Sequence, residues 1–272
     1  MDGGPANAGI LERAELEGTE VPTAADPVAS PPCEVPIGPD SPILAIMSTA
    51  RAMRHLAPDP VPDELISSLI EAATWAPTGG NAQGEAFVVV TDPETKARLA
   101  ALWRRVVDDY RLLMEAAIPG IGSNPSTARV RESVTYQRYH FAETPAIIVA
   151  CYDQRAMRER ARGPLRTAIA AARKAGLRRT AGLFRAWPTI AQRSEAASIY
   201  PAVENLLLAA RAHGLAACLT TWHLLAEAEF KGVLGIPKNV KTFAVIPVGW
   251  PLRRFGPVKR GPVESVIHRE RW

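Results

Sequence analysis

The side chains best suited to ligand binding stand in residues 75–83, which read Trp-Ala-Pro-Thr-Gly-Gly-Asn-Ala-Gln between a helix-like segment and a short β-rich run. Pro77 disfavours a helical conformation in the residue before it and so ends the preceding helix. The two glycines let the backbone approach a ligand closely, and Asn81 and Gln83 offer amide groups that suit the edge of a heteroaromatic ring. The pattern predicts either a ligand-binding loop or a plain connection between a helix and a strand.

Two arginines lie upstream of this loop, in the segment Arg-Ala-Met-Arg-His-Leu at residues 51–56. Guanidinium groups suit phosphate because they offer forked hydrogen-bond donors and stay protonated at physiological pH. Taken without further context, Arg51 and Arg54 fit either contacts to an anion or an exposed, solvated face.

No arrangement of side chains in the sequence indicates acid–base, nucleophilic or metal chemistry. The five histidines show neither HExxH spacing nor a triad pattern. The three cysteines are widely separated and form no CxxC pair, which argues against structural zinc and a disulfide framework. Gly120-Ile121-Gly122 lacks the third glycine of a dinucleotide-binding fingerprint. We therefore predict no catalytic side chain and no metal ligand.

Hydrophobic periodicity and turn signals predict the elements that position these residues. A first helix is expected to open at Ser41-Pro42. Apolar residues at helical spacing predict further helices at 63–74, 94–117, 127–140, 165–179, 195–213 and 226–234. Short β-rich runs predict strands at 87–91, 146–151, 216–220 and 242–248. Strands that alternate with long helices, without tight-hairpin signals, indicate a helix-covered sheet in one domain.

Charge is distributed unevenly along the chain, whose net charge is +4. Residues 1–40 carry eight acids against one base, together with seven prolines and few large apolar residues. They predict a flexible acidic extension before a domain at residues 41–272. Residues 155–193 carry ten arginines and one lysine against a single glutamate, which predicts a basic insert within that domain.

Length and composition restrict the class of protein. A chain of 272 residues, 47% of them hydrophobic, can form one large domain or two small ones. A chain of this length buries roughly 70% of the surface that its unfolded form exposes, without metal or disulfide support. Its first residues show no basic n-region or apolar h-region, and no apolar stretch approaches about 18 residues. We therefore expect a cytoplasmic protein without a membrane span.

Several motifs, taken in order, resemble the FMN-dependent nitroreductase family. The Arg-Ala-Met-Arg segment, the Pro-initiated helix and the Ala-Pro-Thr-Gly-Gly-Asn-Ala-Gln loop follow the usual order and spacing of that family. Further matches are the apolar helix at 202–211, Leu-Gly-Ile-Pro at 234–237, Ile-Pro-Val-Gly-Trp-Pro at 246–251 and Lys-Arg-Gly-Pro at 259–262. The resemblance covers roughly residues 41–150 and 195–272. It implies an α+β fold with a central mixed or antiparallel sheet covered by helices, in an intertwined homodimer.

The resemblance also implies which residues contact the flavin. The cofactor-binding residues that it implies are Arg51, Ala52, Met53, Arg54, Pro77, Thr78, Asn81, Gln83, Cys218, Leu219, Thr220, Thr221, Lys259 and Arg260. The arginines and Lys259 would supply cationic contacts, and Asn81 would contact the ring. Two positions depart from the family pattern, because Ala52 replaces a serine and Gly84-Glu85 replaces Pro-Trp.

FMN, with NADPH or NADH as its reductant, is the implied cofactor. In the implied ping-pong reaction NAD(P)H reduces FMN, the product leaves, and a nitroaromatic, a quinone or a similar small molecule accepts the electrons. The cofactor carries this chemistry while the protein binds, orients and shields it, which agrees with the lack of acid–base side chains. Two alternatives stay open: other redox chemistry on this fold, such as dehalogenation or dehydrogenation, and a non-catalytic flavin-binding protein with an anionic partner.

Three interpretations of the basic insert also stay open. The first is a solvated helical excursion. The second is a lid whose arginines bind the phosphates of NADPH or an acidic substrate, with Phe184 and Trp187 covering an aromatic guest. The third is attachment to nucleic acid or an anionic membrane, but no recognised motif supports it and we expect no nucleic-acid partner. The arginine excess favours NADPH over NADH, and a separate hypothesis pairs the insert with the acidic extension.

Overall fold

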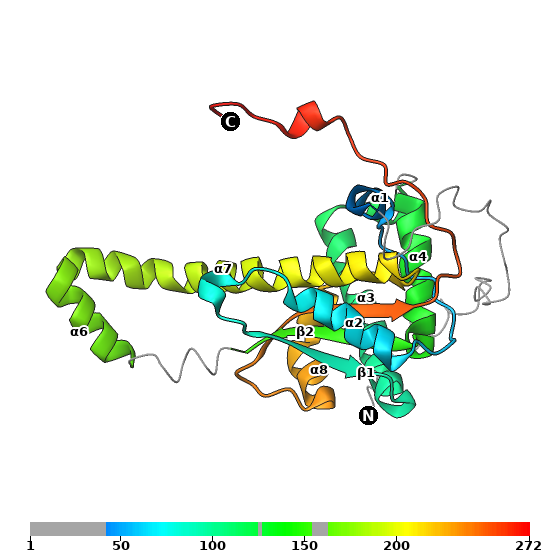
Figure 1. The fold of residues 1–272 in the computed structure, drawn as a ribbon, viewed down its shortest axis with the longest axis horizontal. Coiled ribbons are helices and arrows are strands. Elements are labelled where there is room, and N and C mark those ends of the chain that lie inside the picture. The colour runs from blue at the N-terminus through cyan, green and yellow to red at the C-terminus, as the bar shows by residue number, and fades with distance from the viewer. Residues whose placement is uncertain (1–41, 125–126, 154–162) are drawn as a thin grey trace, which may run out of the picture.

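Four antiparallel strands form the centre of the protein in a computed structural model, which describes residues 42–124, 127–153 and 163–272 (Figure 1). The strands are β1 (Glu85–Val90), β2 (Ala146–Tyr152), β3 (Ala216–Ala217) and β4 (Lys241–Gly249), in the spatial order β1-β2-β4-β3. The predicted strand at 216–220 is shorter than expected, because beyond β3 the chain pairs with β4 only at an isolated bridge between Thr220 and Val245. The α+β class is confirmed, and every pair of described strands is antiparallel.

Helices cover both faces of this sheet (Figure 1). They are α1 (Ile43–Thr49), α2 (Asp63–Thr74), α3 (Pro93–Ala117), α4 (Ala128–His140), α6 (Pro164–Ala175), α7 (Leu177–Ala212) and α8 (Glu227–Leu234). Short 3-10 turns add η1 (Gly79–Asn81), η2 (Ile121–Ser123), η4 (Phe141–Glu143), η5 (Trp222–Ala226) and η6 (Val263–Val266). Capping explains where α3 begins, because the side chain of Asp92 accepts a hydrogen bond from the Thr95 amide at 2.7 Å. The expected cap of α1, Ser41, lies outside the described residues.

The side chains of β2 alternate between two hydrophobic cores, one on each face of the sheet. Ile148 and Ala150 belong to the core beneath α2 and α7. Ile147 and Val149 belong to the opposite core, to which α3, α4 and α8 contribute. Because helices cover both faces, β2 and β4 are apolar almost throughout rather than alternating.

A helical arm, formed by α6 and the first half of α7, projects from the sheet (Figure 1). The sequence predicted one helix at 165–179 and another at 195–213, which was wrong in two respects. The first helix ends at residue 175, and α7 then runs without interruption for 36 residues, through Pro188. Gly176, at φ +77°, takes a backbone conformation that other residues rarely adopt and so separates the two helices. The residues after it are rich in Ala, Leu and Arg, which favour helix.

Two segments singled out in the sequence lie outside the described residues. They are the acidic extension at 1–40 and the first part of the basic insert, up to residue 162. The part of the insert that the structure does describe, residues 163–193, belongs to the helical arm.

Within the described ranges, no helix is long and apolar enough to cross a membrane. The same residues contain no group of three or more His, Cys, Asp or Glu side chains placed to bind a metal ion. The cytoplasmic location and the lack of a metal stay predictions.

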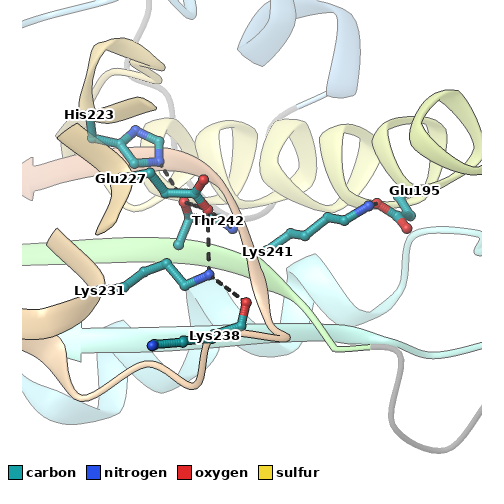
Figure 2. A network of polar contacts seen from close by, with 7 residues as sticks. All are labelled: Glu195, His223, Glu227, Lys231, Lys238, Lys241 and Thr242. Carbon is teal, nitrogen blue, oxygen red and sulfur yellow. Dashed lines mark hydrogen bonds and ion pairs between the residues drawn. The ribbon is translucent and has the colours of Figure 1, made fainter. Parts of the chain in front are cut away.

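A buried hydrogen-bond network joins η5 to the start of β4 and to α8 (Figure 2). The Thr242 hydroxyl donates to Glu227 Oε1 at 2.9 Å, so His223 Nε2, 3.1 Å away, must donate to the Thr242 oxygen. Lys231 Nζ lies 3.7 Å from the same carboxylate oxygen. The network fixes η5, and with it the chain at 218–221, against the sheet.

Replacing His223 is expected to change how stability depends on pH. Complete burial lowers the pKa of His223 to about 4, against 6.5 for an unperturbed histidine. Between these values the unfolded chain binds a proton that the folded chain excludes, so the free energy of unfolding falls as the pH decreases from 6.5 toward 4. Between about pH 7 and pH 5, wild type should lose roughly 2 kcal/mol more than His223→Gln. Urea unfolding at both pH values measures the losses, and equal losses in the two proteins would contradict the expectation.

Candidate functional site

A cavity of about 240 Å³ lies against the C-terminal half of α7. Three segments that are distant in sequence meet in its wall. Arg51 and Ala52 come from the segment after α1, Cys218 and Leu219 from the turn after β3, and Arg260 from the C-terminal segment. The structure thus brings together residues from three of the motifs in which flavin contacts were predicted.

Backbone pairing fixes the segment between α1 and α2 to the edge of the sheet. Met53 N donates to Ala217 O at 3.3 Å, and Leu56 forms an antiparallel bridge with Pro251. The side chains of Met53 and Leu56 are both buried in a small core. Because Met53 points into this core, the two arginines of the segment, at 51 and 54, supply its polar groups.

Arg211 is a candidate that the sequence prediction missed. It is only 5% exposed, it lines the cavity, and its Nε donates to Thr49 Oγ1 at 3.0 Å. Its guanidinium carbon lies 4.0 Å from the centre of the Phe255 ring, an attractive cation–π geometry. Val258 N also donates to Ser48 O at 2.9 Å, which ties the C-terminal segment to α1. The signal that could have revealed Arg211 is its position as a charged residue directly after the apolar run at 206–210.

A second cavity, of about 460 Å³, shares Arg51 and Ala52 with the first. Met53 and Arg54, the remaining predicted contacts of this motif, line the second cavity and not the first. The arginine motif therefore lies between two adjacent cavities: Arg51 lines both of them, and Arg54 lines only the second.

The loop predicted to contact the flavin ring lies apart from both cavities. Gly79 N donates to Ser198 Oγ at 3.1 Å, which anchors the loop to the middle of α7. Ser198 precedes Arg211 by thirteen residues, which is about 20 Å along a helix. The predicted contacts that line neither cavity are Pro77, Thr78, Asn81, Gln83, Thr220, Thr221 and Lys259.

The backbone of this loop is unusual. Gly80, Asn81 and Gln83 all have positive φ angles, of 61°, 53° and 47°, in a region that few residues other than glycine and asparagine occupy. Gln83 Nε2 donates to Asn81 Oδ1 at 2.9 Å, and Gln83 N donates to Thr78 Oγ1 at 3.1 Å. Asn81 and Gln83 are nevertheless exposed, so the hydrogen-bonded pair remains accessible to a ligand.

Close packing explains the departure from the family pattern at Gly84. A Cβ atom at this position would lie 2.8 Å from Tyr152 Cζ and 2.9 Å from Asp153 O. The Asp153 amide also donates to Gly84 O at 2.7 Å, so the two backbones run side by side where β1 begins. A proline at residue 84 would clash here.

Cys218 forms part of the wall of the first cavity. It is buried and accepts a weak hydrogen bond from Gln137 Nε2, with the nitrogen 3.6 Å from Sγ. Burial raises the pKa of the Cys218 thiol, which keeps it protonated at physiological pH. The residue therefore acts as a small apolar wall and not as a nucleophile.

Known proteins resemble this chain in sequence and in fold. The Nitroreductase family matches residues 47–250. An NADH dehydrogenase from Thermus thermophilus is 24% identical over 221 residues, which are 80% of this chain and 90% of that protein. An iodotyrosine deiodinase from Danio rerio is 39% identical over 54 residues, which are only 20% of this chain and 18% of the deiodinase. The structure of an NADPH:FMN oxidoreductase from Vibrio harveyi, complexed with NAD+, superposes with a TM-score of 0.55 at 18% identity, over 85% of this chain and 77% of that one.

The family match spans most of the chain, from the arginine motif through the loop to the last strand. The resemblance to this family that the sequence predicted is therefore confirmed. The chain belongs to the nitroreductase family.

Proposed function

We propose that the protein takes electrons from NAD(P)H through FMN and delivers them to a nitroaromatic, a quinone or a similar acceptor in a ping-pong reaction. The proposal rests on the cavity in which Arg51, Leu219 and Arg260 meet from three motifs. Bound FMN would supply the hydride chemistry, so the side chains around it need only bind, orient and shield.

The residues of the first cavity fit the phosphate end of a flavin. Arg51, Arg211 and Arg260 contribute three guanidinium groups, against one carboxylate, that of Glu204. This excess of positive charge matches a phosphomonoester, which carries about −1.5 to −2 charge at pH 7. Ala52 offers no hydroxyl, so the arginines would supply the larger share of the binding free energy.

A third cavity, of about 680 Å³, gives an aromatic acceptor a place to bind beside the second cavity. It lies between α3 and α4, and Tyr110 and Trp222 stack in its wall with ring centres 4.3 Å apart. Trp222 directly follows the chain at 218–221, and Val130 lines both this cavity and the second one. Further apolar residues in the wall are Leu112, Met114, Ile121 and Val134. A flat, mainly apolar acceptor suits this lining.

The proposed enzyme is a homodimer in which each flavin site uses residues of both chains. The resemblance assigns both the 77–83 loop and the first cavity to the flavin, yet within one chain the residue that anchors the loop, Ser198, lies about 20 Å along α7 from Arg211 in the cavity wall. A second copy can bring its own loop, with exposed Asn81, to the cavity. The helix that leads into the cavity wall, α1, exposes Ile43, Leu44 and Met47, an apolar surface of the kind that association buries.

Reductive dehalogenation is the second candidate function. It is favoured by the local identity to iodotyrosine deiodinase, which is higher than the identity to the Thermus protein but limited to 54 residues. An iodinated aromatic ring would occupy the same apolar cavity as a nitroaromatic. The two candidates therefore differ in the acceptor and share the flavin site.

Replacing Arg51 and Arg260 together should weaken FMN binding. Loss of two charge-assisted hydrogen bonds is expected to raise the dissociation constant of FMN roughly a hundredfold or more. Fluorescence titration of the apoprotein measures it. Arg98→Ala, Arg104→Ala is the matched control, because both side chains are exposed on α3 and line none of the three cavities. Equal affinity in the test and control variants would contradict the phosphate assignment.

Two inactive variants should complement each other if each site is shared between chains. Co-expressed Arg260→Ala and Asn81→Ala chains form a mixed dimer that has one doubly damaged site and one intact site. Random assembly then restores roughly a quarter of the wild-type FMN content and turnover. No recovery above the two separate variants, with mixed dimers demonstrated by differential tagging, would show that each site belongs to one chain.

Steady-state kinetics with several acceptors should separate the candidate functions. Parallel double-reciprocal lines are expected when NAD(P)H and a nitroaromatic or a quinone are varied, because a ping-pong enzyme releases the first product before the second substrate binds. Iodide release from an iodophenol without nitro reduction would favour the second candidate. A protein that binds FMN but turns over none of these acceptors would contradict both candidates.

A further inference from the structure

The second cavity is rich in cationic side chains. Its charged lining residues are Arg51, Arg54, Arg129, Arg253, Arg254 and Glu132. They come from the segment after α1, from α4 and from the segment after β4, so tertiary packing alone brings them together. Positive charges gathered on a concave surface concentrate the local potential and attract anions.

Most of these arginines form no ion pair in the part of the chain that the structure describes. Arg253 donates to Glu132 Oε1 at 2.7 Å, and this hydrogen bond holds the pKa of Glu132 below its usual range. The arginines that donate no hydrogen bond to any described residue are Arg51, Arg54, Arg129 and Arg254. The lining therefore sets one carboxylate, which acts on Arg253 and more weakly on Arg129, against five guanidinium groups.

His55, in the wall of the same cavity, does not add to this charge. Burial, and next the positive charge of Arg253, lower the pKa of His55 to about 4, so the imidazole is neutral at physiological pH. The positive character of the cavity is therefore due to its arginines.

The flavin phosphate alone does not neutralise the positive charge of the two adjacent cavities. Together the two adjacent cavities are lined by two carboxylates and seven arginines, the latter being Arg51, Arg54, Arg129, Arg211, Arg253, Arg254 and Arg260. FMN brings about −1.5 to −2 charge in its single phosphomonoester. The diphosphate that NADH and NADPH share would offset part of what remains, and a second phosphomonoester would offset the rest. Among the proposed reductants only NADPH carries one, on the 2′-oxygen of its adenosine ribose, and arginine is the side chain that accommodates that group.

We propose that Arg129, Arg253 and Arg254 form a binding site for the 2′-phosphate of NADPH beside the flavin site. This inference rests on the proposed function and extends it, because it names the reductant and the residues that select it. It assigns the selection to the second cavity and not to the basic insert.

The preference for NADPH over NADH tests the assignment directly. In the FMN-loaded enzyme, Arg129→Ala and Arg254→Ala should each lower the ratio of kcat/KM for NADPH to that for NADH by roughly ten- to hundredfold, because each removes a charge-assisted contact to the 2′-phosphate. Arg98→Ala on α3, which removes the same charge away from all three cavities, should leave the ratio at its wild-type value. Equal losses with both dinucleotides would overturn the proposal.

Glu132→Gln should shift the ratio in the opposite direction. Removing this carboxylate frees Arg253 and takes one negative charge from the cavity wall, so the preference for NADPH should rise by roughly two- to tenfold at fixed ionic strength. A fall in the preference would overturn the proposal, because Glu132 would then support the ligand and not compete with it.

Calorimetry separates failure of this proposal from failure of the proposed function. The FMN-loaded protein is titrated with adenosine 2′,5′-bisphosphate and with adenosine 5′-monophosphate, neither of which can reduce a flavin. Tighter binding of the bisphosphate, lost in Arg129→Ala and Arg254→Ala but kept in Arg98→Ala, supports the 2′-phosphate site even if neither dinucleotide reduces the protein. Equal affinity for the two nucleotides in wild type overturns it, even if the protein proves to be an active reductase.

Discussion

The packing of one apolar stripe of α7 against the sheet fixes the rest of the arrangement. Val203, Leu206 and Ala210 recur at helical spacing and are buried in the core beneath α7. This packing sets the rotation of the helix, and the remaining faces then make the contacts that concern function. Ser198 accepts the hydrogen bond of the polar loop, while Arg211 contacts α1 and the C-terminal segment. A rotation by one residue, about 100°, would break both sets of contacts together.

The same rigid helix also keeps the loop and the first cavity apart. Because α7 is continuous between Ser198 and Arg211, the residue that anchors the loop and the buried arginine of the cavity wall stay about 20 Å apart along the helix in one chain. The loop agrees with this, because Asn81 and Gln83 adopt positive φ angles and nevertheless expose their amide groups to the outside. Unfavourable backbone conformations persist where the surrounding structure imposes them, and they concentrate at binding sites. The proposed homodimer accounts for this separation, because a second chain would supply the loop.

Local patterns in the sequence predicted single elements well, and tertiary relations poorly. The helix at 63–74 was predicted at its observed bounds, because Pro62 marks where it can begin and Pro77 prevents the helix from continuing. The arginine motif was also identified, but its division between two cavities depends on burial that no motif encodes. Arg129, Arg253 and Arg254 belong to no motif, and they meet only because α4 and the end of β4 pack on the same edge of the domain. Motifs report residues that act through their neighbours in sequence, so a site assembled from unrelated segments stays hidden until the fold is known.

Screening by salt limits how far an arginine can influence the electrostatic potential in the cavities. Arg193, the last residue of the basic insert, precedes Arg211 by eighteen residues, about 27 Å along α7. That distance exceeds three Debye lengths at physiological ionic strength, each about 8 Å, so solvent screens the arm from the cavities of its own chain. The arm also exposes Leu183, Trp187 and Ile190, which the described part of its own chain does not cover. The outside of the arm therefore combines exposed arginines with large apolar side chains, a surface of the kind that contacts another molecule.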